Sequence, residues 1–205
     1  KSVNTIYEDR EENTWILTNN GISFINKNNT DSVINYFSTK SAAETKFAFY
    51  SAFELEDEIW FGTNTGEILR YLKNDDVFIP LQTSAKSRIT KIDQLDRSTL
   101  FVATQSDGFF TYDKNSRQLT LYNSENIPDF DMNNASITHI AKPDRIWFTN
   151  NKLGIYQLNL STKQLDYYYV ETNDASSASF PPSPFILTDR KNQLWVHPNG
   201  GGFSV

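Results

Sequence analysis

Few side chains in this 205-residue sequence could perform acid–base or metal chemistry. It contains two histidines, His139 and His197, and no cysteine, which excludes disulfides, thiolate zinc sites and cysteine nucleophiles. There is no Gly-x-Ser-x-Gly nucleophile elbow, and the acidic pairs at 75–76 and at 129 and 131 lack the spacing of a calcium loop. We therefore expect no catalytic residue, no metal and no cofactor in this chain.

Composition and charge narrow the class of protein further. The net charge is −6, which argues against a nucleic-acid partner or an anionic membrane surface. No apolar run approaches the roughly 20 residues of a membrane span. Aromatic residues make up 14% of the chain, enough for a sizeable core, and the many Asn, Thr, Ser and Tyr residues favour β-structure with turns. The chain begins with Lys and has no signal-peptide pattern, so we expect it to be part of a longer protein.

One short motif recurs five times along the chain. Each copy opens on a lead aromatic and carries a glycine six or seven residues later, and an Asp precedes each lead aromatic by three to six residues. The lead aromatics are separated by 45, 41, 46 and 48 residues and the glycines by 45, 42, 46 and 47. These residues are Trp15, Trp60, Phe101, Trp147 and Trp195, with Gly21, Gly66, Gly108, Gly154 and Gly201. We interpret the lead aromatics as core residues, the Asp as a turn former and the glycines as hairpin residues.

The repeat predicts the fold. Each unit contains four short segments rich in β-formers, and a late aromatic closes the fourth at Tyr36, Tyr122 and Tyr168, with Phe78 in the second unit. Four strands in 41 to 48 residues is the period of a β-propeller blade, whereas a β-sandwich would not repeat one motif five times. We predict an all-β propeller with four full blades at 1–44, 45–86, 87–134 and 135–180 and a truncated fifth at 181–205. It would be an open, C-shaped part of a seven-bladed ring, with exposed sheet faces at both ends.

The motif resembles the two-component regulator propeller repeat. Trp60-Phe-Gly-Thr63-Asn-Thr-Gly66 matches the core of that repeat in full, and the segment from Ile6 to Phe24 matches nearly as well, with Leu17 where the family prefers Gly. Departures occur in the later units, such as Phe101 for Trp. The resemblance implies a periplasmic sensor region of a hybrid two-component system of Bacteroidetes, in which propellers precede a membrane helix, a histidine kinase, a receiver and a DNA-binding domain. The usual role is detection of a polysaccharide breakdown product.

The predicted ligand face is the one where the second-to-third-strand turns and the inter-blade connections emerge. It is rich in amides and hydroxyls, which suit neutral hydroxylated ligands, and Tyr50 or Phe130 could supply an aromatic platform. The residues predicted to contact a ligand are Asn19, Asn20, Asn64, Thr65, Gln105, Asn150, Asn151 and His139. The alternative interpretation is that Asn and Thr are good turn formers and that the histidine is structural.

Three classes of function fit these observations. The first is a ligand-sensing propeller segment of a sensor kinase; the second is a propeller lyase or hydrolase that acts on polysaccharide; the third is a passive protein-interaction scaffold. The resemblance favours the first. The partners then expected are an oligosaccharide, the remaining blades of the parent chain and a second copy of the full-length sensor in a homodimer, with no nucleic acid and no membrane contact by this segment.

Overall fold

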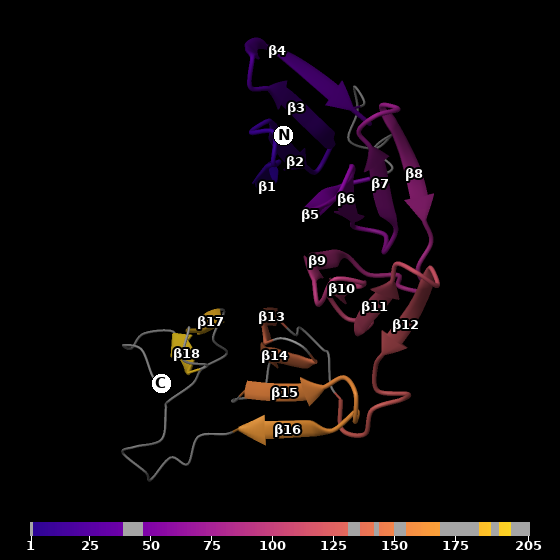
Figure 1. Cartoon of the computed structure of the whole chain (residues 1–205), viewed down its shortest axis with the longest axis vertical. Helices are drawn as coiled ribbons and strands as arrows, with labels where there is room; N and C mark the ends of the chain where they lie inside the picture. The colour runs from indigo at the N-terminus through magenta and orange to yellow at the C-terminus, as the bar shows by residue number, and fades with distance from the viewer. Residues whose placement is uncertain are drawn as a thin grey trace. The chain divides into compact units, whose positions relative to one another are not determined.

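The computed structural model describes residues 2–38, 47–130, 136–141, 144–149, 155–168, 185–189 and 193–197. All regular structure in these residues is β-strand (Figure 1), and no helix among them is long and apolar enough to cross a membrane. Four antiparallel sheets have four strands each, paired in chain order, and a fifth sheet has two strands. We number these sheets one to five along the chain. The all-β class and the four-stranded unit are therefore confirmed, while the blade boundaries and the open arc stay predictions.

The strands of the first sheet are β1 (Val3–Glu8), β2 (Thr14–Thr18), β3 (Gly21–Asn26) and β4 (Asn29–Tyr36). Those of the second are β5 (Phe49–Leu55), β6 (Glu58–Thr63), β7 (Ile68–Leu72) and β8 (Val77–Leu81). Those of the third are β9 (Ile89–Gln94), β10 (Thr99–Thr104), β11 (Phe109–Asp113) and β12 (Gln118–Tyr122). Those of the fourth are β13 (Ser136–Ala141), β14 (Arg145–Thr149), β15 (Ile155–Asn159) and β16 (Leu165–Tyr168). The fifth sheet has β17 (Phe185–Thr188) and β18 (Leu194–His197).

The chain forms two compact units. The first unit contains residues 1–93 and 101–104, and the second contains residues 94–100 and 105–205. Because β-strand side chains alternate between the two faces of a sheet, one face of β2 carries Trp15 and Leu17, both buried. The core of the first unit lies where this face of the first sheet packs on Phe49, Ile59 and Phe61 of the second.

The lead aromatic of the first sheet is at the centre of that core. The ring centroid of Trp15 lies 5.3 Å from that of Phe61 and 5.1 Å from that of Tyr71, distances at which aromatic pairs add stabilisation beyond their buried area. Phe78 packs in the same layer, 4.8 Å from Tyr71. Its assignment as the late aromatic is wrong, because it pairs with Tyr71 early in β8 and Leu81 ends that strand.

Three of the repeated glycines occupy turns that no other residue fits easily. Gly21, Gly66 and Gly108 have φ of 95°, 85° and 104°, which L side chains rarely adopt. A Cβ at Gly21 would also lie 2.3 Å from the carbonyl oxygen of Tyr36. The hairpin therefore closes against the end of the fourth strand. Gly154 and Gly201 lie outside the described residues.

Candidate functional site

In the first unit, the predicted ligand face is the end of the sheets where the β2–β3 and β6–β7 turns lie. Val3 at the start of β1 pairs with Thr18 at the end of β2, and Phe49 at the start of β5 pairs with Thr63 at the end of β6. Asn19 and the residues that open β1 and β5 are thus brought to one end. We call this end the turn end.

Four polar or aromatic side chains meet at the turn end, and we call them the Tyr50 cluster: Asn4, Asn19, Tyr50 and Arg88. The amide nitrogen of Asn4 donates to Oδ1 of Asn19 at 2.8 Å and to the carbonyl oxygen of Phe49 at 2.9 Å. The hydroxyl of Tyr50 donates to the same Oδ1 at 3.4 Å. Asn19 is exposed and the other three are half-buried.

Arg88 supplies the cation of the Tyr50 cluster. Its Cζ lies 4.1 Å from the ring centroid of Tyr50, within the range of a cation–π contact. Within the described parts of the chain Arg88 forms no ion pair. A guanidinium has five N–H donors in a planar fork that fits a carboxylate. The cluster can therefore bind a ligand that carries hydroxyl or carboxylate groups, but this face of the Tyr50 ring is already occupied by Arg88.

Other predicted contact residues contribute to the turns themselves. Oδ1 of Asn64 accepts from the backbone N–H of Ala48 at 2.9 Å, and its own N–H donates to the carbonyl of Ala48 at 2.9 Å. The N–H of Asn20 donates to the hydroxyl of Thr18 at 3.0 Å. The hydroxyl of Thr65 lies 3.1 Å from that of Thr63. These contacts support the alternative interpretation for this set, since each holds a hairpin or the connection before β5.

The remaining predicted residues are in the second unit. Gln105 is exposed after β10, and His139 is in β13 opposite Trp147. Asn150 and Asn151 lie outside the described residues. Phe130 is 3% exposed and packs on Phe109 and Phe148 at 5.2 and 5.4 Å, so its interpretation as an exposed platform is wrong.

At the opposite end of the first sheet, Asp9 organises the β1–β2 turn. Its Oδ1 accepts from the N–H groups of Glu11 at 3.0 Å and Asn13 at 2.9 Å, and its Oδ2 accepts from the indole N–H of Trp15 at 2.9 Å. Burial alone would raise the pKa of Asp9, but the hydrogen bonds from Trp15 and Asn13 outweigh it and hold the pKa below its usual value. The interpretation of this Asp as a turn former is confirmed. Its hydrogen bond to the indole of the lead Trp is a second role that the sequence analysis did not predict.

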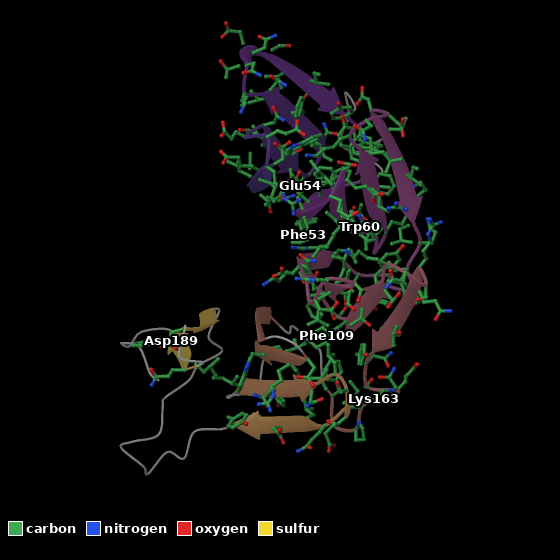
Figure 2. All side chains as sticks on the ribbon, viewed as in Figure 1. Phe53, Glu54, Trp60, Phe109, Lys163 and Asp189 are labelled. Atoms are coloured by element: carbon green, nitrogen blue, oxygen red, sulfur yellow. The ribbon has the colours of Figure 1, made fainter. Side chains whose placement is uncertain are left out.

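The spacing of Asp and Trp decides which acid binds the indole. Asp189 is six residues before Trp195, as Asp9 is before Trp15, and it accepts from that indole at 3.1 Å (Figure 2). In the second sheet the Asp is only three residues before Trp60, and the indole donates to Glu58 at 3.0 Å instead.

An ion pair that the repeat motif does not predict lies in the second sheet and contacts the β1–β2 turn of the first sheet. The side chain of Glu54, which is labelled in Figure 2, is 3% exposed. The Lys73 side chain is 15% exposed, and the two form an ion pair. Oε2 of Glu54 also accepts from the backbone N–H of Arg10 at 2.7 Å. Burial alone would lower the pKa of Lys73, but Glu54 and Glu11 outweigh it and raise the pKa. Within the described residues, no three His, Asp or Glu side chains are grouped to hold a metal ion.

Comparison with known proteins shows that solved extracellular domains share this fold. No family model and no curated protein matches the chain. Among solved structures it is similar to the extracellular domain of BT3049 from B. thetaiotaomicron, described as a hybrid two component system, with 16% identity and a TM-score of 0.72 over 95% of this chain and 27% of that one. The extracellular domain of BT4673 from the same organism, described likewise, matches with 18% identity and a TM-score of 0.69 over 98% of this chain and 27% of that one.

A designed protein is similar in the same way. The computationally designed Ika8 matches 99% of this chain and 57% of its own, with 9% identity and a TM-score of 0.66. At these identities the likeness establishes the fold, and the chain has a propeller-like all-β fold shared with those extracellular domains. It spans about a quarter of the length of the two B. thetaiotaomicron structures.

Proposed function

We propose that this chain is a ligand-sensing segment in the periplasmic propeller region of a hybrid two-component sensor histidine kinase. The observation that carries the proposal is the likeness in fold, over 95% and 98% of the chain, to the extracellular domains of two systems of that kind. The segment from Trp60 to Gly66 supports the same class independently, because it resembles the core of the two-component regulator propeller repeat. The remaining blades, the membrane helix and the kinase would belong to the rest of the parent chain, which would act as a homodimer.

We further propose that the ligand is an oligosaccharide released from a polysaccharide and that it binds at the Tyr50 cluster. The amides of Asn4 and Asn19 and the phenol of Tyr50 are suited to sugar hydroxyls. Arg88 adds a guanidinium without an acidic partner among the described residues, which favours a sugar that carries a carboxylate. Ligand binding at the turn end would change the activity of the kinase through the rest of the propeller region.

Calorimetry on the intact periplasmic region tests this proposal. We expect heat without turnover from an acidic oligosaccharide, and binding weakened about tenfold or more in Arg88→Met, because a charge-assisted hydrogen bond is worth about 1.5–3 kcal/mol. Arg97→Met, which removes an exposed arginine from the β9–β10 turn, is the matched control and should bind normally. No heat with any neutral or acidic glycan would refute sensing and favour a scaffold, and product formation would favour a polysaccharide lyase or hydrolase.

A further inference from the structure

The first sheet has an apolar face on the side away from Trp15. Strand alternation places Ile6, Ile16, Ile25 and Val33 on it, with Ile6 opposite Ile16 and Ile25 opposite Val33. Ile6 is 66% exposed and Val33 is 50% exposed. The same face also carries Glu8, Thr14, Ser23 and Asn35. Four branched apolar side chains that are exposed or half-buried on one face, one on each strand, are unusual on a solvated sheet.

The same register positions in the second sheet are covered. Ile16 and Phe61 each follow the lead Trp of their strand, and Ala52 is opposite Phe61 just as Ile6 is opposite Ile16. In β7 and β8, Tyr71 and Phe78 form the pair that corresponds to Ile25 and Val33. These second-sheet residues pack around Trp15 in the core of the first unit. The first sheet therefore repeats a surface that, in the second sheet, is buried by a neighbouring sheet.

The charged pair is repeated as well. Glu8 is opposite Thr14 and Glu54 is opposite Ile59, each of which directly precedes the lead Trp, so the two glutamates are equivalent. Lys27 follows β3 as Lys73 follows β7. Glu8 is exposed, and the Lys27 side chain is 41% exposed and bonds to the exposed Glu12 at 3.0 Å.

We propose that the face of Ile6, Ile16, Ile25 and Val33 docks a further sheet of this same repeat. The lead aromatic of that sheet packs on the four apolar side chains, and a backbone N–H of its Asp turn caps Glu8, as Arg10 caps Glu54. This inference rests on the proposed function, because the docking sheet is supplied by the same polypeptide in the intact sensor. The similar extracellular domains are about four times the length of this chain, which leaves ample sequence for such a sheet.

Neighbouring residues of β4 allow a matched test. Val33 is on the proposed docking face, whereas Ile34, 47% exposed, is on the other face of the same strand. In the intact sensor we expect Val33→Asp to lower the melting temperature by about 2 °C or more, because it places an unpaired carboxylate between two packed sheets. In the 205-residue chain the same change should leave it unaltered. Ile34→Asp should have the same effect in both proteins, and Val33→Thr, a milder change, should reproduce the difference if the Asp variant does not fold.

Two results would overturn the inference. One is an equal effect of Val33→Asp in the intact sensor and in the 205-residue chain. The other is a self-associated 205-residue chain that Val33→Asp converts to monomer in the ultracentrifuge, because a second copy would then cover this face. Calorimetry with oligosaccharides on the same intact protein separates this outcome from the proposed function, since glycan binding can fail while the docking face is buried.

Discussion

The first and second sheets carry the same pair of charges in two different environments. In the second sheet, Glu54 and Lys73 are buried against the turn that contains Arg10. In the first sheet, Glu8 and Lys27 occupy the equivalent positions and are exposed. The Glu and the Lys recur at equivalent positions in the two sheets while the neighbouring sheet differs, so burial of the pair depends on the adjacent sheet. In a repeat protein, stability is divided between each unit and its interface with the next, and this pair belongs to the interface.

The largest expected effect separates the two glutamates. Glu54→Ala should destabilise the chain by about 3 kcal/mol, because it leaves the N–H of Arg10 without its acceptor and Lys73 with the exposed Glu11 as its remaining ion-pair partner. Glu8→Ala should change stability by less than about 0.5 kcal/mol, as is usual for exposed positions. Urea unfolding of the two variants measures both values. Equal losses would show that the environments of the two carboxylates do not differ as described.

The second prediction compares the turn acids of the first and third sheets. Asp9→Asn should cost about 2 kcal/mol, since the buried carboxylate accepts from an indole and two backbone N–H groups. Asp96→Asn should cost less than about 1 kcal/mol. The Asp96 carboxylate is exposed and accepts from Ser98 and Thr99, and the side chain of the lead residue Phe101 has no N–H to donate. Thermal unfolding at pH 7 provides the comparison, and a costlier Asp96→Asn would contradict it.

Acid unfolding should show a smaller effect at the same residue, Asp9. The pKa of Asp9 is lower in the folded chain than in the unfolded one, so its contribution is complete above the unfolded value of about 3.9 and is lost as the pH falls through the folded value. The stability gap between wild type and Asp9→Asn should therefore narrow between pH 5 and pH 2, by part of its neutral value. Asp31→Asn, in β4, serves as the control, and a constant gap for Asp9→Asn would exclude the pKa shift.

The smallest effect is expected at the exposed lysine. Lys27→Met should change the free energy of unfolding by less than about 0.5 kcal/mol, as exposed ion pairs contribute little. Lys73→Met should be nearly as costly as Glu54→Ala, because the buried Glu54 loses its lysine partner and keeps the contacts from Arg10. Guanidinium unfolding of both variants measures these free energies. A loss of stability in Lys27→Met comparable to that in Lys73→Met would contradict the exposed environment of Lys27 in the first sheet.

Much of the fold could be predicted because its determinants recur in sequence. The lead aromatic, the turn Asp and the hairpin glycine mark the second strand and its ends, and the structure has a four-stranded sheet at each of the first four copies of the motif. The buried pair was missed although Glu8 and Glu54 are 46 residues apart, as are Lys27 and Lys73. Charged residues on strands usually face solvent. The recurrence of this Glu and Lys therefore does not indicate burial until the packing of the two sheets is known.

The candidate site was less predictable. Turn composition predicts Asn19, and the expectation of an aromatic platform predicts Tyr50. Neither predicts Asn4 or Arg88, because their proximity depends on strand pairing and on the start of the third sheet. The prediction of Phe130 as an aromatic platform was wrong because its burial also depends on tertiary packing. It lies in a polar connection after β12, and only packing on the aromatic residues of the second unit shows that it is buried.

A structure of the intact sensor region at a resolution that shows side chains tests the equivalence of the two sheets most directly. The decisive observation is the environment of the Glu8 carboxylate. We expect it to be buried and to accept from a backbone N–H of an Asp-containing turn, at a distance close to the 2.7 Å between Glu54 and Arg10. A Glu8 carboxylate that remains in solvent, with Ile6 and Val33 uncovered, would contradict the equivalence.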